Sequence, residues 1–590
     1  MRAKAEILAR LHAGGPTNGL RLATVSGVLT TRPGMIAWVD RMVPEIEIIT
    51  TKSYQVRANP GYREPVLLER GIGSYANAVG LRNPGMKAGL EELTALRSRH
   101  KLRALLAVSL SANRIEDFVT LARRFTPIAD ILELNFSCPH AAPGYGSSIG
   151  TDPRLVRSYV EAIRTATGAV LFAKLTPNVE DIGEVARAAV AAGADGLSAI
   201  NTVGPQRFLE PVSGKAILSN PNGGRGGKSG EWIKEEAIQS IRRIRESVGP
   251  HVPIIGMGGV TSAEDIVAMK QAGANVIGLG SAFARVPRQD LIPLYAGALR
   301  RDFDEGSRDA ETFLTNEPLM RYRSFRIRRT RRFGDTLRTI VLDGKLSASA
   351  SQYAFLFLPG EGEKPFSIAC CDPLTFVVRE RGAFTAALLQ VQAGERLLVR
   401  GPYGAVAPHS ARSKACIVAG GTGLALAPLL ARALLESGKD VVLLFGSTRE
   451  EDLELLPALE LPCRRIAAAD RGRPARILDS LPGCLDSPAG DRYCFYNVGP
   501  AGFLERACRR ERALGIPPAE IFLSLETPSL CGVGLCGSCE CGGRLLCKEG
   551  TFVTLQHLEN HGLSPRSFGG HTHSSAEGRV TEPEAPILRH

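Results

Sequence analysis

The sequence predicts an α/β protein whose first half is a (β/α)8 barrel. Residues 20–300 alternate short apolar runs, such as 102–110, 170–177 and 275–282, with amphipathic segments such as 180–194. Continuous apolar runs indicate strands that are buried on both faces, and their alternation with helices indicates a parallel sheet. Six or more such units in roughly 280 residues favour a closed barrel over a doubly wound sheet.

The length of the chain predicts further domains after this barrel. A chain of 590 residues is too long for a single hydrophobic core. The segment after the barrel is β-rich and interrupted by turns, which is typical of a small antiparallel barrel, and a β-α-β pattern then indicates a Rossmann-like nucleotide domain. The expected boundaries are 1–302 for the first barrel, 303–322 for a linker, 323–410 for the antiparallel barrel, 411–515 for the nucleotide domain, 516–565 for a cysteine-rich domain and 566–590 for a disordered tail.

Composition and charge argue against several classes of protein. No apolar run reaches the length of a membrane span, and the N-terminal residues lack the apolar core of a signal peptide. The cysteines cluster instead of spreading as pairs, which suits a reducing cytoplasm. A net charge of +12 and a basic run at 321–333 could attract nucleic acid, but no RNA-binding motif with interleaved aromatic residues accompanies them. We interpret the run as a linker and solvated strand face, or as a funnel for an anionic cofactor.

Five of the thirteen cysteines lie close together near the C-terminus, in CGVGLCGSCECGGRLLC. The spacing C-x4-C-x2-C, followed by a further cysteine, is that of a plant-type 2Fe–2S cluster. A zinc ribbon is the alternative, but it prefers two C-x2-C pairs, and only one is present. The expected ligands are Cys531, Cys536, Cys539 and Cys547. Cys541 is a spare thiol or an alternative fourth ligand.

Polar residues follow several apolar runs of the first half, where barrel active sites form. Cys138 is the only cysteine in the first 369 residues, and it stands just beyond such a run. A buried, inert cysteine would more often lie inside the run. Lys52 and Lys174 also end apolar runs, which is not the pattern of surface lysines. Amide and hydroxyl groups able to donate and accept hydrogen bonds are offered by Asn77, Asn135, Asn201 and Thr202.

Eight segments occur in a characteristic order across most of residues 20–285. They are TTKSYQVRANP, YANAVGLRNPG, ELNFSCPH, FAKLTPN, AINT, GGKSG, IGMGGV and GLGSA. In these segments the first half resembles the flavin barrel shared by the dihydroorotate dehydrogenases and the dihydropyrimidine dehydrogenases. The resemblance implies a TIM barrel that binds FMN and a small pyrimidine substrate.

The resemblance also implies roles for individual residues. Cys138 would take the proton from C5 of the substrate as general base, while hydride leaves C6 for FMN N5. The glycine-rich loops would offer backbone N–H groups to the FMN phosphate, although tight turns need glycine as well. The implied cofactor-binding residues of the barrel are Ser26, Lys52, Ser53, Asn77, Asn135, Lys174, Asn201, Gly227, Ser229, Gly230, Gly258, Gly259, Gly280 and Ser281. The implied substrate contacts are Lys52, Asn77, Asn135, Asn201 and Thr202.

One position of the cysteine motif departs from the dihydroorotate dehydrogenases. They usually continue it with asparagine, as SCPN, whereas this chain has His140. SCPH looks closer to dihydropyrimidine dehydrogenase, and residues 203–225 match neither family. His140 could donate to a carboxylate when protonated, or it could simply pack against its neighbours. Reduction of uracil or thymine therefore remains an alternative to oxidation of dihydroorotate.

The second half resembles the electron-transfer subunit of two-subunit (class 1B) dihydroorotate dehydrogenase, a relative of ferredoxin reductase. The segments KPFSI, GAFTAAL and RGPYG correspond to its FAD site, and AGGTGLALAPLL corresponds to its glycine loop for dinucleotide phosphates. Lys364 replaces the usual arginine, and Val498 replaces a cysteine before Gly-Pro. The implied cofactor-binding residues here are Lys364, Pro365, Phe366, Ser367, Gly401 and Gly404 for FAD, and Gly420, Gly421, Thr422 and Gly423 for NAD.

Together the two resemblances suggest a single-chain fusion of both subunits. The hypothesis is that the chain oxidises (S)-dihydroorotate to orotate in pyrimidine biosynthesis, with electrons passing from FMN through the 2Fe–2S cluster and FAD to NAD. Two rivals use a similar barrel. One is a tRNA dihydrouridine synthase, which would need a basic helical RNA-binding domain, and the other is an electron carrier whose barrel has lost its substrate. We expect a cytoplasmic protein and, by analogy with the parent family, a homodimer.

Overall fold

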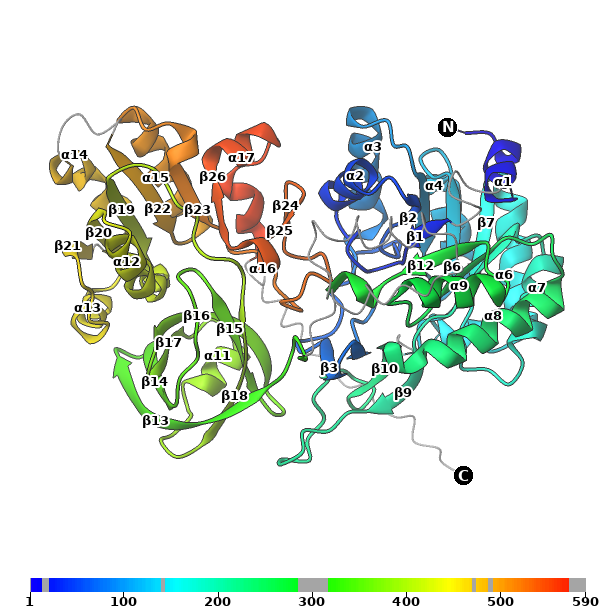
Figure 1. Cartoon of the computed structure of the whole chain (residues 1–590), viewed down its shortest axis with the longest axis horizontal. Helices are drawn as coiled ribbons and strands as arrows, with labels where there is room; N and C mark the ends of the chain where they lie inside the picture. The colour runs from blue at the N-terminus through cyan, green and yellow to red at the C-terminus, as the bar shows by residue number, and fades with distance from the viewer. Residues whose placement is uncertain are drawn as a thin grey trace, which may run out of the picture.

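The computed structural model describes residues 2–12, 21–139, 144–284, 317–469, 474–485 and 492–571, and the statements below concern these ranges. Figure 1 shows the first barrel on the right, two smaller units on the left and the cysteine-rich segment between them. Three features discussed above lie outside the described residues, namely His140, the linker up to 316 and the tail from 572. The described part contains no helix that is long and apolar enough to cross a membrane.

Eight parallel strands close the first barrel, which confirms the predicted fold. Their order around the barrel is β1-β12-β11-β8-β7-β6-β5-β2. Every residue of β5 and β7 is buried, because these strands face the barrel interior on one side and helices on the other. The strands are β1 (Leu22–Thr24), β2 (Ile46–Thr50), β5 (Leu105–Leu110), β6 (Ile131–Asn135), β7 (Val170–Lys174), β8 (Gly196–Ala199), β11 (Ile254–Met257) and β12 (Val276–Leu279).

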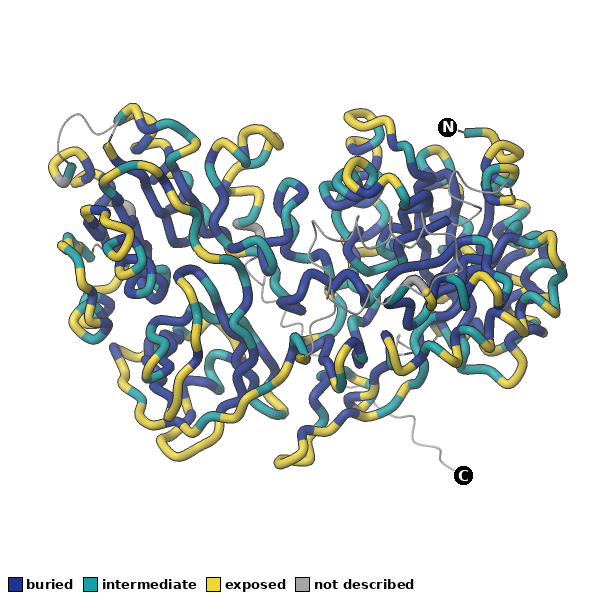
Figure 2. The backbone as a smooth tube through the Cα atoms, in the orientation of Figure 1, coloured by how far each residue is buried: buried dark blue, intermediate teal, exposed yellow. Residues whose placement is uncertain are grey.

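Amphipathic helices cover the outside of this barrel, so the buried backbone in Figure 2 lies inside a layer that is partly exposed. In α4 (Ile115–Phe125), Phe118, Leu121, Ala122 and Phe125 are buried, and their spacing of three and four residues places them on one face. The other helices are α1 (Lys4–His12), α2 (Pro33–Met42), α3 (Gly85–Arg99), α5 (Ser147–Gly150), α6 (Pro153–Ala166), α7 (Ile182–Ala191), α8 (Lys234–Val248) and α9 (Ala263–Gln271).

A small antiparallel sheet accompanies the barrel, in the order β3-β4-β10-β9. Its strands are β3 (Leu67–Gly71), β4 (Ser74–Asn77), β9 (Val203–Arg207) and β10 (Arg225–Gly230). The register pairs Gly227 with Asn77 and Ser229 with Tyr75. The segment 203–225 that matched neither flavin family begins with β9 and ends at the first residue of β10, so it starts in this sheet and returns to it.

The antiparallel barrel of the second half is also confirmed, with strand order β13-β14-β17-β16-β15-β18. Its interior holds apolar side chains such as Ile340, Leu356 and Phe376. The strands are β13 (Arg323–Phe333), β14 (Leu337–Asp343), β15 (Tyr353–Leu358), β16 (Gly362–Cys371), β17 (Leu374–Arg379) and β18 (Arg396–Tyr403), with one helix, α11 (Ala383–Leu388). Just before β13, Met320 is buried and its N–H donates to Glu69 Oε2 at 3.0 Å, so the end of the expected linker is packed against the first barrel.

The nucleotide domain is built on a six-stranded sheet in the order β21-β20-β19-β22-β23-β26, parallel except for β26. Its strands are β19 (Lys414–Gly420), β20 (Asp440–Ser447), β21 (Arg464–Ala469), β22 (Tyr493–Val498), β23 (Ile521–Ser524) and β26 (Phe552–Thr554). Its helices are α12 (Ala427–Glu436), α13 (Leu455–Ala458), α14 (Leu481–Cys484) and α15 (Ala501–Ala513). β23 and β26 lie beyond the boundary expected at 515, so the cysteine-rich segment shares this sheet.

The cysteine-rich segment leaves the sheet after β23, returns through β26 and lies between the two halves (Figure 1). It carries β24 (Glu540–Cys541), β25 (Arg544–Leu545) and α16 (Leu546–Glu549), and α17 (Leu555–Asn560) follows β26. Leu29 N donates to Leu535 O at 2.8 Å, which attaches the segment to the loop after β1. Gly404 N donates to Cys547 O at 2.9 Å, which attaches it to the antiparallel barrel.

The start of the expected disordered tail is ordered. Residues Pro565–His571 form a 3₁₀ helix, and Arg566 forms an ion pair with Glu505 of α15. The polar composition of the tail pointed to disorder, but a contact with a neighbouring helix is invisible in composition.

Candidate active site

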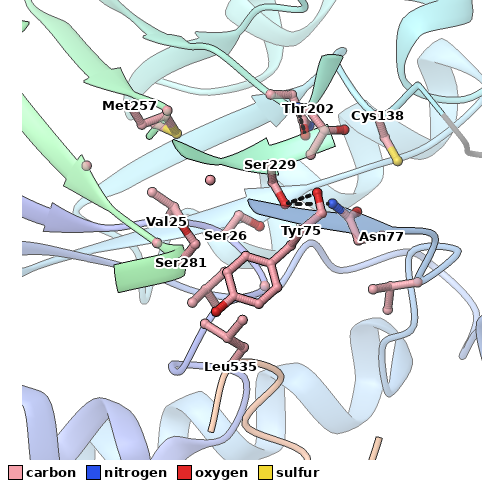
Figure 3. Close-up of a pocket in the computed structure, with 18 of the residues that line it drawn as sticks. Val25, Ser26, Tyr75, Asn77, Cys138, Thr202, Ser229, Met257, Ser281 and Leu535 are labelled. Atoms are coloured by element: carbon pink, nitrogen blue, oxygen red, sulfur yellow. Dashed lines mark hydrogen bonds between the residues drawn. The ribbon is translucent and has the colours of Figure 1, made fainter. Parts of the chain in front are cut away.

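An open cavity of about 220 Å³ lies at the C-terminal ends of the first barrel's strands. Its lining includes, from the sites expected above, Ser26, Lys52, Ser53, Asn77, Asn135, Cys138, Lys174, Asn201, Thr202, Ser229, Gly230, Gly258, Gly259, Gly280 and Ser281. Figure 3 shows Cys138, Thr202 and Asn77 around this cavity, with Val25 and Ser281 on another side. Parallel strands of a barrel all end at one rim, which is why residues so far apart in sequence meet here.

Among the cofactor-binding residues expected in the first barrel, Gly227 does not line the cavity. It lies behind Thr202, because a Cβ at Gly227 would come within 2.2 Å of Thr202 Oγ1. Its carbonyl accepts from Asn77 Nδ2 at 3.3 Å. Gly227 thus allows Thr202 and Asn77 to approach β10.

A chain of hydrogen bonds fixes the amide groups at the base of the cavity. Asn135 Nδ2 donates to Ser53 Oγ at 2.9 Å. Ser137 Oγ donates to Asn135 Oδ1 at 2.9 Å, and Asn201 Nδ2 donates to Ser137 Oγ at 2.8 Å. Ser137 was not among the expected site residues, although it directly precedes Cys138. The chain leaves each amide one orientation, which is how a site recognises a small polar ligand.

The two lysines of the cavity are in different electrostatic environments. Lys174 Nζ lies 3.9 Å from Glu133 Oε1, and both side chains are almost fully buried. Lys52 forms no ion pair with any residue in the described ranges, and burial lowers its pKa to about 8, against the opposing charges of Cys536 and Cys138. A half-buried ammonium at the cavity wall without a carboxylate partner favours an anionic ligand.

Cys138 brings a thiol to the cavity, and Thr202 brings a hydroxyl. Cys138 is buried, with a relative exposure of 6%. Thr202 Oγ1 is buried and has no hydrogen-bond partner among the described residues. A buried hydroxyl without a partner is unfavourable unless a ligand or water completes it. The cavity therefore offers a thiol, a hydroxyl without a described partner and a half-buried cation to one small molecule.

The remaining donors suit a phosphate and a flat ring. Gly258 and Gly259 follow β11, and Gly280 and Ser281 follow β12, so their backbone N–H groups stand at the rim where barrels bind phosphate. Gly259 has φ +73°, and a Cβ there would lie 2.8 Å from Lys234 Cβ. The loop thus needs glycine at this position. The residues present fit FMN.

The cysteine-rich segment contributes to the same cavity, through Cys531, Leu535 and Cys536. Figure 3 shows Leu535 approaching the cavity from that segment. The sequence motifs gave no sign of this contact, because it joins residues about 500 positions apart. It places two of the expected cluster cysteines beside the expected flavin site.

Four cysteines form one group, which contains two pairs joined by a backbone hydrogen bond. Cys536 N donates to Cys531 Sγ at 3.5 Å, and Cys547 N donates to Cys539 Sγ at 3.5 Å. Hydrogen bonds from the side chains of Cys536 and Cys547 lower the pKa of Cys531 well below its ordinary value. Cys541 stands apart from this network, and burial raises its pKa to about 12.

The cysteine group offers the donors that an iron–sulfur cluster needs. A 2Fe–2S cluster is held by four thiolates, two at each iron, with amide N–H groups near the sulfurs. Backbone N–H groups reach the sulfurs of Cys531 and Cys539, so the residues present fit such a cluster. Among the described residues, no three His, Cys, Asp or Glu side chains are arranged around a position for a single metal ion.

The residues expected at the FAD site lie on β16 and at the end of β18. Lys364, Pro365, Phe366 and Ser367 are half-buried in a strand that is otherwise largely buried. The Phe366 ring lies 6.4 Å from that of Phe384 in α11. This partly open stretch beside a helix fits a flat cofactor.

Two of these expected FAD residues contact other parts of the chain. Lys364 Nζ donates to Glu64 Oε2 of the first barrel at 2.9 Å, and Gly404 N–H is bound to Cys547. A charged partner supplied by another domain could not be seen in the motif itself. Lys364 therefore sits where a flavin diphosphate and Glu64 would compete for it.

The glycine loop expected for NAD follows β19 and faces the end of β22. A Cβ at Gly423 would come within 2.6 Å of Val498 O, and one at Gly420 within 3.0 Å of the Phe503 ring. β19 and β22 are neighbours at the point where the strand order reverses, which is where open α/β sheets bind dinucleotides. Gly421 and Thr422 lie between them on the same loop.

The fold and the cavity define a (β/α)8-barrel enzyme that presents a cysteine, lysines and amides to a small anionic ligand. The sequence profile described as dihydroorotate dehydrogenase matches residues 24–288. The chain belongs to the dihydroorotate dehydrogenase family and is an oxidoreductase of that family.

Relatives in several organisms support this assignment. The chain is 41% identical over 234 residues to the catalytic subunit of dihydroorotate dehydrogenase B (NAD(+)) from Methanothermobacter thermautotrophicus, covering 40% of this chain and 74% of the relative. It is 40% identical over 261 residues to the subunit of the same name from Pyrococcus abyssi, covering 44% and 83%. The Bacillus pumilus subunit is 36% identical over 237 residues, covering 40% and 73%.

Proposed function

We propose that this chain oxidises (S)-dihydroorotate to orotate and transfers the electrons to NAD+ within one polypeptide. The observation that carries the proposal is the shared cavity, in which Cys531 and Cys536 of the cysteine-rich segment stand beside Lys52 and Cys138 of the barrel. A metal centre at that position would adjoin the substrate site, and its module would provide the nucleotide site.

The barrel residues account for the oxidation of the substrate. Cys138 accepts the C5 proton as general base, and bound FMN supplies the acceptor for the C6 hydride. Lys52 provides positive charge for an anionic ring and helps to keep the Cys138 thiolate. The amides of Asn135 and Asn201, held by Ser137, orient the pyrimidine.

The second half would complete the redox chain. Cys531, Cys536, Cys539 and Cys547 would hold a 2Fe–2S cluster, which supplies one-electron transfer. The β16 residues 364–367 would bind FAD, and the loop Gly420–Gly423 would bind the phosphates of NAD(H). The proposal also includes a cytoplasmic homodimer without nucleic-acid or membrane partners, by analogy with the parent family.

Anaerobic purification followed by cofactor and substrate assays tests the proposal. We expect FMN, FAD and two irons per chain, and flavin bleaching when dihydroorotate is added. Dihydrouracil serves as the matched substrate without a carboxylate, and it should leave the flavin oxidised. Bleaching by dihydrouracil alone would instead establish the dihydropyrimidine reaction suggested by His140. Zinc or a colourless protein would refute the electron chain.

A further inference from the structure

Arg400 is the largest side chain that is fully buried in the described chain. It forms a two-pronged ion pair with Glu363, with Nε–Oε2 at 2.8 Å and Nη2–Oε1 at 2.5 Å, and neither side chain is exposed. Its guanidinium lies 3.7 Å from the centre of the Phe355 ring. Removing two charges from water is so unfavourable that such pairs rarely add net stability, which points to another role.

The remaining donors of Arg400 reach the cysteine-rich segment. Nη1 donates to Cys531 O at 2.7 Å, and Nη2 lies 3.4 Å from Leu530 O. Nη1 also donates to Tyr403 OH at 3.1 Å. The guanidinium thus binds the backbone that carries the first expected cluster ligand, and Glu363 fixes the guanidinium.

A second layer of contacts holds this ion pair in place. Tyr322 OH donates to Glu363, and Tyr403 OH donates to Leu319 O at 2.9 Å. Glu363 N donates to Glu64 O of the first barrel at 3.2 Å. The pair therefore connects the antiparallel barrel, the end of the linker and the first barrel around one point, the carbonyl of Cys531.

We propose that Arg400 is a positioning residue, which fixes the position of Cys531, and with it the cluster, relative to the barrel cavity. This inference rests on the proposed function. Cys531 lines that cavity, so a shift of its backbone changes the separation between the cluster and the barrel flavin. Glu363 balances the charge of Arg400. The effect comes from hydrogen bonds to the ligand's backbone, and such outer contacts commonly change metal affinity or activity by about 10–100-fold.

The test compares two variants of the full-length protein. The double variant R400M/E363Q removes both charges, so neither is left buried alone, and R400K keeps the ion pair but loses the fork that reaches two carbonyls. We expect dihydroorotate to reduce the barrel flavin at the wild-type rate in both variants, because neither residue lines the barrel cavity. Electron exchange between the flavins should slow at least about ten-fold in the double variant and less in R400K. The EPR g-values of the reduced cluster should shift as well.

The matched control is the ion pair Arg379–Asp452 of the same half, which is largely buried and does not reach the cysteine-rich segment. R379M/D452N should keep wild-type exchange and the wild-type EPR spectrum. Unchanged exchange and g-values in R400M/E363Q overturn the inference, as does an equal loss in the control. Absence of iron or of a second flavin from the wild-type protein would instead refute the proposed function.

Discussion

The two halves of this molecule position their expected cofactor residues by different means. In the first barrel, Cys138, Lys174 and Asn201 need only follow successive strands, because all parallel strands end at one rim. In the second half, Lys364 pairs with Glu64 of another domain and Gly404 binds the cysteine-rich segment. A site built by strand order can be located from sequence, whereas a site built by contacts between domains cannot.

The strongest test of the first half is removal of its thiol. Cys138→Ala removes the proposed base, so flavin reduction by dihydroorotate should fall by about 10²–10⁴-fold. Flavin content should stay at the wild-type level, because the phosphate loops after β11 and β12 are untouched. Stopped-flow absorbance under anaerobic conditions measures the rate. Wild-type reduction would remove Cys138 from the mechanism.

The pairing of the cysteines makes an equally specific claim about the second half. Cys536→Ser should abolish the visible absorption and iron content of the cluster, because it breaks the Cys531–Cys536 pair. Cys541→Ser is the matched control, since Cys541 lies outside both pairs, and it should keep full iron. The measurement is iron and acid-labile sulfide per chain. Loss of iron from the control variant would make Cys541 a ligand.

A smaller effect on FAD affinity should distinguish the two expected partners of Lys364, which are the FAD diphosphate and Glu64. Lys364→Met removes a charge expected to bind the FAD diphosphate, so FAD affinity should fall by about ten-fold, the scale of one charge-assisted hydrogen bond. Glu64→Gln frees Lys364 from its ion pair and should not weaken FAD binding. Titration of the FAD-stripped protein gives both affinities. Equal affinities in Lys364→Met and wild type would leave the lysine with a docking role only.

The smallest effect concerns stability of the nucleotide domain and its pH dependence. Burial raises the pKa of Glu511 from 4.5 to about 8, while Asn497 opposes the shift. Between pH 4.5 and about 8, the Glu511 carboxyl is protonated in the folded state but ionised in the unfolded state. The contribution of Glu511 to the free energy of unfolding is therefore fully present below pH 4.5 and is lost as the pH rises through 8. Glu511→Gln should therefore flatten the fall in Tm between pH 5.5 and 8.5.

Thermal unfolding at the two pH values measures this effect. Glu505→Gln, on the same helix but partly exposed, is the control and should follow wild type. If the Tm of Glu511→Gln falls as steeply with rising pH as the Tm of the wild-type protein, the buried Glu511 carboxyl is ionised in the folded state.

The barrel and its cavity were predictable because hydrophobic runs and the residues after them follow strand periodicity. Eight strands, the antiparallel barrel and the nucleotide sheet are present as predicted. Ser137 was missed although it lies inside the cysteine motif, because its role is to connect two amides. Arg400 was missed because RGPYG was assigned to the FAD site through Gly401 and Gly404, and only tertiary structure brings the Arg400 guanidinium to Cys531. The sheet shared by β23 and β26 was missed because strand neighbours far apart in sequence leave no local signal.

That sharing has a practical consequence for anyone who would dissect the protein. A truncation at residue 515 removes β23 and β26 together with the cysteines, and it exposes the edge of β22 to solvent. An uncovered strand edge promotes aggregation, so a minimal reductase cut at this point should precipitate. The cysteine-rich segment and the six-stranded sheet must therefore be kept together in any engineered fragment.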